Sequence, residues 1–562
     1  MEQQRLFLTI GLFFLLYLAY DAWQLEFGPK PVVTPTVQTT GKSTPSTNIP
    51  VGADSSSSVP VSTAPSAIPS ASTVVAVKTI EKAQRVLVET DVLRLELDSR
   101  GGDIRVVDLV NYPETSKDDK KAFRLMSDAN KNLFIAQSGF AGKRDLNNGT
   151  VIAAPNHNTI YKVEKTSYKL EDGKDVLKVN LFWISADNVV FTKTYEFTRG
   201  SYQITVSHKI ENHSNRTWRG NLYQQLQRKD FADENQSSFI YTYTGGVLYS
   251  PEEKYEKIDF SDMADEDLNR EVKNGWLAMI QHYFLAAWVP PVGSEQTYFT
   301  SDLKDSRYTM GMKASNEAQV TAGTTQVLSN TLFVGPKIQD DLEKIAPGLE
   351  LTVDYGVLTF IAKPIFWALN KINNFVSNWG WSIILLTMLI KLIFYKLSEA
   401  SYKSMANMRK VQPRLVAMKE RFGSDRQKMN QAMMKMYKEE KINPLGGCLP
   451  ILVQIPVFIS LYWVLLESVE LRQADWIFWF TDLSAKDPYF VLPLLMGITM
   501  FIQQKLNPPP MDPMQAKIMQ ALPIVFTIFF AFFPAGLVLY WVVNNTLSIA
   551  QQWYITKIVI KA

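Results

Sequence analysis

The order of apolar and polar residues changes several times along the chain, and each pattern predicts a different kind of structure. From residue 85 to about residue 345, apolar and polar residues alternate within short segments. In "VLRLELD" (92–98) the leucines alternate with arginine and glutamate. A period of two is typical of a half-buried β-strand. Gly101 and Gly102 follow this segment and predict a turn.

Further segments of the same kind predict a whole β domain. "NVVFTKTYEF" and "SYQITVSHKI" flank Arg199 and Gly200 and predict a hairpin. "FIYTYTGG" (239–246) and "TLFVG" (331–335) also have strand character, and little helical periodicity appears before "KIQDDLEKI" at 337–345. We therefore expect a large antiparallel β domain over 85–350, built as a sandwich.

Helical periodicity begins beyond Tyr355. In "KPIFWALNKINNF" (363–375) four apolar residues fall on one helical face, opposite three asparagines and a lysine. This apolar face consists of Ile365, Leu369, Ile372 and Phe375. Such a helix, expected over 360–376, suits a position in the plane of a membrane interface, although a plain connecting helix has the same pattern.

Long apolar runs then predict membrane-spanning helices. The first is "WSIILLTMLIKLIFYKL" (381–397), followed by 446–467 and 488–505. The run 518–554 is nearly twice the length of one bilayer crossing. Pro534 and Gly536 suit a reversal of direction, so we expect two helices there.

The N-terminal residues contain another apolar run, "LFLTIGLFFLLYLAYDAW" (6–23), behind Arg5. A cleaved secretion signal requires a small-x-small cleavage site. The bulky Tyr20, Trp23 and Leu25 favour an uncleaved anchor instead, which brings the expected number of spans to six. The following residues, about 31–79, are rich in Pro, Ser and Thr and predict a flexible tether.

The charges of the loops predict the orientation. The segment 398–445 is rich in Lys and Arg, whereas 468–487 has only Arg472 and Lys486 beside four acidic residues. The positive-inside rule places the first segment in the cytoplasm and the second outside. Both chain ends then lie in the cytoplasm, and the β domain is exported.

The basic segment predicts a helical hairpin. "SMANMRKVQPRLVAMKERFG" and "DRQKMNQAMMKMYKEEK" are both helical in pattern, Gly423 suits a helix stop, and Ser424 or Asp425 suits an N-cap. Methionines are frequent here and suit a surface that accepts varied apolar partners. Packing between the two helices explains them equally well. The candidate contacts are Met408, Met418, Met433 and Met434.

Lys391 places an ammonium inside the first long span. A lysine at the centre of a spanning helix costs about 2.5–3.5 kcal/mol on insertion scales. It could extend toward the cytoplasmic headgroups, but Lys396 is better placed for that role. Thr387 shares its helical face, and Gln454 lies in the next span. Since no acidic residue lies deep in any span, we expect a water-filled, positively charged recess.

Composition argues against several other functions. The net charge of +3 lacks the basic excess typical of nucleic-acid proteins. The single cysteine, Cys448, excludes an internal disulfide framework. Neither a metal-ligand spacing, a Ser/His/Asp grouping nor a phosphate loop is evident, so we expect no enzymatic activity, no metal and no cofactor. The four histidines are His157, His208, His213 and His282.

Long segments of the chain resemble the YidC/Oxa/Alb family of membrane-protein insertases in its Gram-negative form. They include "NPLGGCLPILVQIPVFISLYWVL" (443–465), "DLSAKDPYFVLPLLMGITMF" (482–501) and "FPAGLVLYWVVNN" (533–545). The resemblance implies a periplasmic β-supersandwich, a five-helix transmembrane core around a hydrophilic groove, and a cytoplasmic hairpin. It also implies that the protein inserts nascent membrane proteins into the bacterial inner membrane, alone or with the Sec translocon. Ribosomes and the signal recognition particle receptor are implied partners.

The resemblance also assigns residues to the groove. The family's groove cation aligns with Lys391, its threonine with Thr387, its glutamine with Gln454 and the first of two tyrosines with Tyr540. The cation is typically arginine in such relatives, and lysine keeps the charge but loses the planar fork. Trp541 stands where the second tyrosine is common, which puts a hydroxyl contact there in doubt.

The prediction is a multidomain membrane protein whose segments are as follows. They are an anchor at 1–24, a linker at 25–84, the β domain at 85–350, the interfacial helix at 360–376, spans at 377–397, 446–467, 488–505, 517–533 and 534–556, the hairpin at 398–445, a periplasmic loop at 468–487, a cytoplasmic loop at 506–516 and a tail at 557–562. The alternatives are a small-solute transporter and a carbohydrate-binding module tethered to the membrane.

Overall fold

The computed structural model describes residues 83–115, 118–142, 153–231, 242–423, 425–440, 449–507 and 513–559. The predicted anchor at 1–24 and nearly all of the linker at 25–84 lie outside these residues, as does Cys448. The chain forms two units. One contains the hairpin from Lys403 to its end, and the other contains the β domain with the remaining helices.

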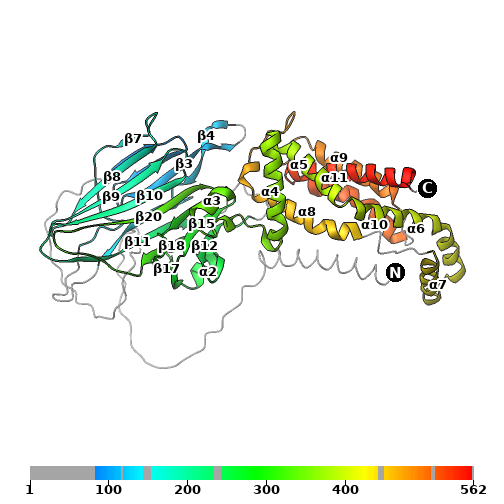
Figure 1. Cartoon of the computed structure of the whole chain (residues 1–562), viewed down its shortest axis with the longest axis horizontal. Coiled ribbons are helices and arrows are strands. Elements are labelled where there is room, and N and C mark those ends of the chain that lie inside the picture. Colours follow the sequence, from blue (N-terminus) through cyan, green and yellow to red (C-terminus); the bar gives the residue numbers. More distant parts are fainter. Residues whose placement is uncertain are drawn as a thin grey trace, which may run out of the picture. The chain divides into compact units, whose positions relative to one another are not determined.

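Two large sheets form the β domain (Figure 1). The first sheet contains β14 (Asn269–Lys273), β17 (Glu295–Asp302), β18 (Arg307–Ala314), β11 (Trp218–Lys229), β5 (Phe134–Gly142), β3 (Asp103–Thr115), β2 (Leu93–Asp98), β1 (Arg85–Glu89) and β7 (Ser167–Lys169), with β4 (Asp118–Met126) and β19 (Ala318–Val320) beside β3 and β11. The second contains β13 (Lys254–Ile258), β12 (Gly245–Ser250), β15 (Trp276–Gln281), β16 (Phe284–Val289), β20 (Thr325–Pro336), β10 (Gln203–Asn212), β9 (Val189–Thr198), β8 (Val176–Ile184) and β6 (Lys162–Val163).

Strand patterning explains the core of this domain. The leucines of β2 are buried and pack in one apolar cluster with Val206 of β10, Trp288 of β16 and Leu332 of β20. Because alternate residues of a strand point to opposite faces, one face of each sheet supplies this core. Strand pairing is antiparallel except between β1 and β7. The predicted β domain with two packed sheets is therefore confirmed.

Individual turns test the sequence predictions more closely. β9 and β10 pair antiparallel around Gly200, which has φ 70°. Gly101 and Gly102 also have positive φ, a conformation that glycine adopts without steric cost. The predicted strand across "FIYTYTGG" (239–246) was wrong at 242–244, because β12 begins at Gly245 and contains only the last two residues of that segment.

The remaining elements are helical, and their bounds are as follows. They are α2 (Phe260–Asp265), α3 (Gln339–Ile345), 3-10 turns at Leu349–Thr352, Gly356–Leu358 and Val469–Leu471, α4 (Thr359–Val376), α5 (Trp379–Ile393), α6 (Tyr395–Phe422), α7 (Arg426–Glu439), α8 (Leu449–Glu467), α9 (Val491–Leu506), α10 (Pro513–Phe530), α11 (Ala535–Tyr554) and a π-helical end at Ile555–Val559.

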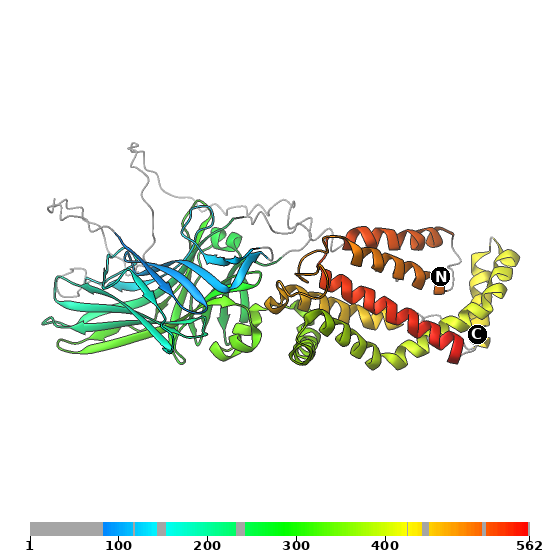
Figure 2. The same ribbon diagram turned by 90° about the horizontal axis from the view of Figure 1, so that it is seen from above.

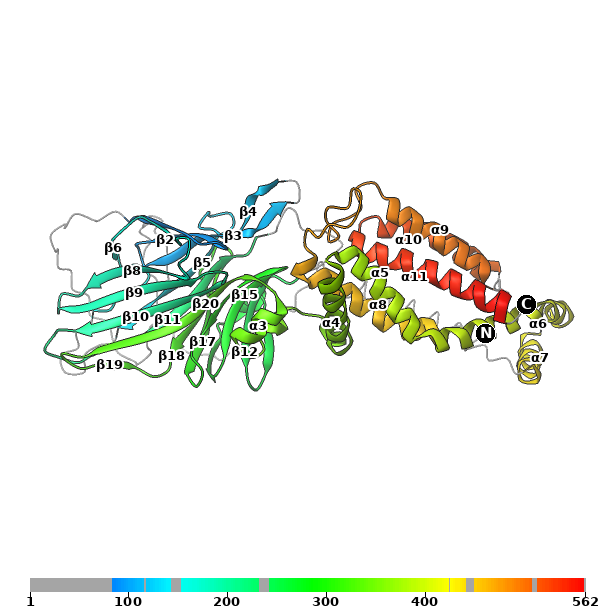
Figure 3. The ribbon, with the colours of Figure 1, turned by 45° about the horizontal axis from the view of Figure 1, so that its top comes forward.

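Helix α11 is at the centre of the helical core and contacts α5, α8 and α9. Figure 2 shows the orange helices α9 and α10 on one flank of the red α11. Figure 3 shows α4 crossing the ends of α5 and α8, which it contacts. α9 and α10 approach closely at Gly497, where any side chain would collide with Thr527. A glycine is therefore required at this crossing.

Two helix ends bear on the predicted spans. The long apolar run divides as expected, since α10 ends at Phe530 and Pro534 is the N-cap of α11. The predicted span at 377–397 is instead broken at Phe394, with α5 on one side and α6 on the other. The two helices are bent by 67°. The apolar pattern continues across this break, so the pattern alone could not locate it.

By length and apolar composition, no single helix within the described ranges is sufficient to cross a membrane, although α5 and α6 together are. Three shorter apolar helices run over Leu452–Glu467, Val491–Leu506 and Ala516–Phe530. The six spans accordingly stay a prediction.

Helix α4 matches the amphipathic segment only in part. Its inner face packs on the helical core through Ile365, Phe366 and Leu369, and Ile372 is partly buried there. Phe375, which the sequence pattern placed on the same face, is 92% exposed. The reason is that α4 ends at Val376, beyond the last turn that the core covers.

The β domain is joined to the end of α8 by buried polar contacts. Lys337 Nζ lies 3.2 Å from Glu467 Oε2 and also donates to the carbonyl of Thr352 at 3.2 Å. His282 Nε2 donates to the carbonyl of Leu466 at 2.9 Å. Because polar groups removed from water are stabilised only when paired, these contacts fix where the β domain meets the helix.

The hairpin unit consists of α7 and most of α6. Asp425 caps α7 by accepting a hydrogen bond from the Lys428 amide at 3.0 Å, as predicted. Arg414 of α6 pairs with Glu440 at 2.5 Å. Apolar residues on both helices are buried, among them Leu415 and Met433.

Candidate functional site

A row of buried polar residues runs along α11. Asn544, Ser548 and Gln552 are spaced by four residues and are all buried. Residues four apart share one face of a helix. The first half of α11, Ala535–Val543, is almost entirely apolar, so this face forms a polar strip in the second half of the helix.

Helix α5 places Lys391 against this strip. Its ammonium donates a hydrogen bond to Ser548 Oγ at 2.7 Å, and Ser548 Oγ donates to the carbonyl of Asn544 at 2.7 Å. Thr387 lies one turn before Lys391 and is buried, but its hydroxyl donates to the carbonyl of Ile383 at 2.6 Å. The threonine therefore shares the face of Lys391 without bonding to it.

Helix α8 completes the arrangement from the other side. Gln454 Nε2 donates to Asn544 Oδ1 at 2.5 Å. Lys391, Ser548, Asn544 and Gln454 therefore form one chain of contacts that links α5, α11 and α8. We call these four residues the polar network.

The electrostatics of the polar network are unusual because its partners are neutral. Within the described parts of the chain, no carboxylate pairs with Lys391. A buried cation normally has an anionic partner or access to water. The geometry thus supplies a cation in an apolar helical core, held by a hydroxyl. Among the described residues, no group of three or more His, Cys, Asp or Glu could hold a metal ion.

Two of the predicted groove residues lie in an aromatic cluster instead. Tyr540 stacks on Phe458 with 6.0 Å between ring centroids, and Trp541 meets the same ring at 4.9 Å. Trp541 also contacts Phe530. The structure therefore brings Lys391 and Gln454 together through α11, and it places Tyr540 and Trp541 beside them in an apolar wall.

Sequence reasoning missed Ser548 and Gln552. Asn545, next to Asn544, donates to Thr499 Oγ1 at 3.4 Å. The four-residue spacing from Asn544 to Gln552 was the available signal. It was overlooked because serine and glutamine are common in helices of every kind.

The candidate methionines differ in exposure. Met433 is buried within the hairpin unit, whereas Met434 is 54% exposed. Met408 and Met418 are half-buried. Only Met434 among these four therefore offers most of its side chain to a partner, and Met433 fits the alternative role of packing the hairpin.

These features define a protein with an antiparallel β domain followed by an apolar helical core that contains a half-buried cation. Two family profiles match this division: the YidC periplasmic domain over residues 85–368 and the 60Kd inner membrane protein family over 371–562. The membrane protein insertase YidC of Methylococcus capsulatus is 54% identical over 96% of this chain and 95% of its own length. The membrane protein insertase YidC of Thioalkalivibrio sulfidiphilus is 50% identical over 100% of this chain and 99% of its own length. The chain belongs to the YidC family of membrane protein insertases.

A solved structure is also similar. It is described as an active YidC insertase crystal structure with the first transmembrane domain resolved. It has a TM-score of 0.38 and 18% identity, and the match covers 84% of this chain and 93% of that one. The family assignment follows from the sequence relatives and the two profiles alone.

Proposed function

We propose that this protein inserts nascent membrane proteins into the bacterial inner membrane and assists their folding, without enzymatic chemistry. Family membership supports the activity. The observation that carries the mechanism is the contact of Lys391 with Ser548, a neutral partner inside the helical core. A cation held this way attracts acidic segments without being neutralised beforehand.

The exposed surface of the helical core supports a membrane location. Large apolar side chains on the outer faces of α5, α8, α9 and α10 are exposed, including Leu392, Leu452, Leu494 and Ile524. Contiguous apolar surface of this kind is unfavourable in water and marks contact with lipid or protein. We infer six spans with both chain ends in the cytoplasm and the β domain in the periplasm, as the loop charges predict.

The polar network would act as the floor of a hydrated groove. Lys391 and Gln454 would line the side open to water, Thr387 would remain buried on the helical face of Lys391, and Tyr540 and Trp541 would form the apolar wall. Polar flanks of a client would then cross part of the bilayer beside hydrogen-bonding groups instead of hydrocarbon, which lowers the transfer cost. Apolar client helices would slide along the lipid-facing sides of 446–467 and 518–533.

The hairpin would receive clients on the cytoplasmic side. Met434 offers an exposed, flexible apolar surface, and basic residues surround it. We infer that ribosomes, the signal recognition particle receptor and the Sec translocon are the partners that deliver or share clients. The lipid bilayer is the solvent into which clients are released.

Insertion of an acidic-tailed client into proteoliposomes tests the electrostatic part. Lys391→Glu should reduce insertion strongly, whereas Lys391→Arg should keep it, because only the first change reverses the charge. The matched control is Lys396→Glu, since the Lys396 side chain is 91% exposed and pairs with Glu399 at the surface. Equal insertion by the wild type and Lys391→Glu would refute the role of the cation.

A further inference from the structure

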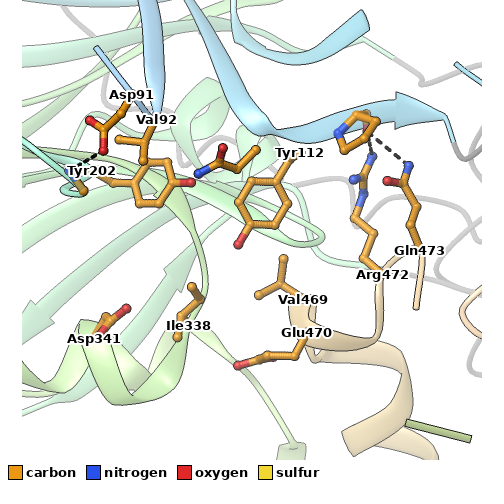
Figure 4. A pocket seen from close by; sticks show the side chains of 13 residues that line it. Asp91, Val92, Tyr112, Tyr202, Ile338, Asp341, Val469, Glu470, Arg472 and Gln473 are labelled. Atoms are coloured by element: carbon orange, nitrogen blue, oxygen red, sulfur yellow. Dashed lines mark hydrogen bonds between the residues drawn. The ribbon is translucent and has the colours of Figure 1, made fainter. Parts of the chain in front are cut away.

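A cavity of about 790 Å³ lies where the β domain meets the loop after α8 (Figure 4). Its walls come from β3, from the segments beside β2 and β10, from the start of α3 and from residues 469–473. This volume lies within the range of small-molecule sites. The cavity is lined by other structural elements than those of the polar network and shares no residue with it. The proposed insertion mechanism therefore gives this cavity no role.

Negative charge predominates in the walls. The carboxylates of Asp91, Asp341 and Glu470 line the cavity together with the guanidinium of Arg472. That guanidinium is already occupied, because Nη2 donates to the carbonyl of Pro113 at 2.7 Å and the group lies over two phenylalanine rings. It is therefore a structural group of the wall that keeps its positive charge, and the three carboxylates together outweigh it.

Two of the three carboxylates have partners within the protein. Asp91 accepts a hydrogen bond from the amide of Gly200 at 2.8 Å, and Asp341 accepts one from Lys344 at 3.1 Å. Glu470 differs in part: its own backbone amide bonds to the carboxylate, but its Oε2 is buried and meets no hydrogen-bond donor from any described residue. A buried carboxylate oxygen without a donor is costly, so a ligand that supplies one would be favoured.

The groups around Glu470 reinforce this requirement. Burial, together with the carboxylates of Asp340 and Asp341 on α3, raises the pKa of Glu470 to about 7. Tyr112 on β3 and Tyr355 face it, and the negative charge of Glu470 contributes to raising the pKa of both tyrosines. No cation among the described residues pairs with this carboxylate.

Aromatic rings supply the other wall. Tyr112 and Tyr202 lie with 6.3 Å between ring centroids, and Asn111 lines the cavity next to Tyr112. Figure 4 shows the hydroxyl end of Tyr112 pointing toward the carboxylate of Glu470. A carboxylate close to aromatic rings is a combination that recognises ammonium groups, by ion pairing with the carboxylate and by cation–π attraction to the rings.

We propose that this cavity binds an organic cation carrying a primary ammonium group, with Glu470 as its counter-ion and Tyr112 and Tyr202 as its aromatic walls. A metal ion is a poorer fit, because the described residues contain no group of three or more His, Cys, Asp or Glu that could hold one. The proposal does not depend on the insertion function, since the cavity shares no residue with the polar network.

Calorimetric titration with cadaverine tests the proposal on the full chain in phosphatidylglycerol nanodiscs. Glu470→Gln should weaken binding by about tenfold to a hundredfold, the loss expected for one charge-assisted hydrogen bond. The matched control is Glu343→Gln, an exposed glutamate of α3 that does not line the cavity and should leave binding unchanged. Between pH 6 and pH 8, binding to the wild type should strengthen by about tenfold as Glu470 ionises, and Glu470→Gln should abolish that gain.

The source of the ammonium group can be distinguished in the same system. If the group belongs to a lipid headgroup, nanodiscs with phosphatidylethanolamine should block cadaverine binding, and Glu470→Gln should remove the block. If it belongs to a free amine, the lipid should have no effect. Absence of cadaverine binding in phosphatidylglycerol nanodiscs, or equal binding by Glu470→Gln, would overturn the proposal, as would binding of neutral sugars in place of amines.

Discussion

Lys337 of the β domain and Glu467 at the end of α8 form a buried salt bridge, with their side chains only 3% and 8% exposed. The two residues are 130 positions apart in the chain. Lys337 also donates to the carbonyl of Thr352, so these contacts fix where the end of the last strand meets the helical core. Its energetic role can be measured by removing one partner or both.

Lys337→Met should lower the stability by about 3–5 kcal/mol, because it leaves Glu467 buried without a counter-charge. Lys337→Met combined with Glu467→Leu should recover most of this loss, since no uncompensated charge remains. Thermal unfolding of the purified protein in nanodiscs checks both. Lys344→Met, which removes an exposed lysine of α3, is the control and should change little.

The stability of this junction should also depend on pH through His282. Burial, followed by the nearby charge of Lys337, lowers the pKa of His282 to about 3. Unfolded chains protonate histidine near pH 6.5 and the folded protein does not, so stability should be lost as the pH falls from about 6.5 toward 3. Each pH unit in this window contributes roughly 1.4 kcal/mol.

His282→Gln keeps an N–H donor for Leu466 and cannot be protonated, so it should reduce the fall in unfolding temperature between pH 7.5 and pH 5. His213→Gln, at an exposed histidine of the same domain, is the control and should behave as the wild type. An unchanged acid sensitivity in His282→Gln would mean that other groups, such as the buried His157, dominate the response.

Ser548 allows the charge of the polar network to be changed without touching Lys391. Ser548→Asp should place a carboxylate beside the ammonium and neutralise it, so insertion of acidic-tailed clients should fall by roughly tenfold, or about 1.4 kcal/mol. Ser548→Asn has nearly the same shape without the charge and should keep most activity. Equal loss in both variants would show that packing, and not charge, is what matters at this position.

The crossing of α9 and α10 should tolerate no side chain at Gly497. Gly497→Ala should destabilise the helical core by about 1–3 kcal/mol, because the added methyl group meets Thr527, whose hydroxyl is held by the carbonyl of Pro523 at 2.7 Å. Thr527→Ala should restore much of the stability in the double variant. Heat-induced unfolding in detergent, with Thr527→Ala alone as reference, checks this.

Local sequence signals predicted where the elements begin and end better than they predicted which elements contact one another. Gly200 marked the β9–β10 hairpin because glycine adopts positive φ without steric cost, and Pro534 marked the start of α11 because proline fixes φ. The break at Phe394 had no such signal and interrupts a continuous apolar run. Phe375 has the same helical spacing as the buried residues of α4, yet the core does not extend far enough to cover it.

The candidate site could be predicted only in part for the same reason. Lys391 was conspicuous as a charge in an apolar run, and Gln454 as an amide in the next one. That both reach α11, through Ser548 and Asn544, is a tertiary relationship that no local pattern contains. The buried pair of Lys337 and Glu467 was invisible in the sequence, since neither residue is unusual in its own segment.

The bond between Lys391 and Ser548 joins residues 157 positions apart, and that between Gln454 and Asn544 joins residues 90 apart. During synthesis, α5 and α8 leave the ribosome well before α11 exists. The ammonium of Lys391 therefore lacks its partner Ser548 until α11 has been synthesised. An insertase of this design is itself a demanding client while it is being made, and its last helix is the one that completes it.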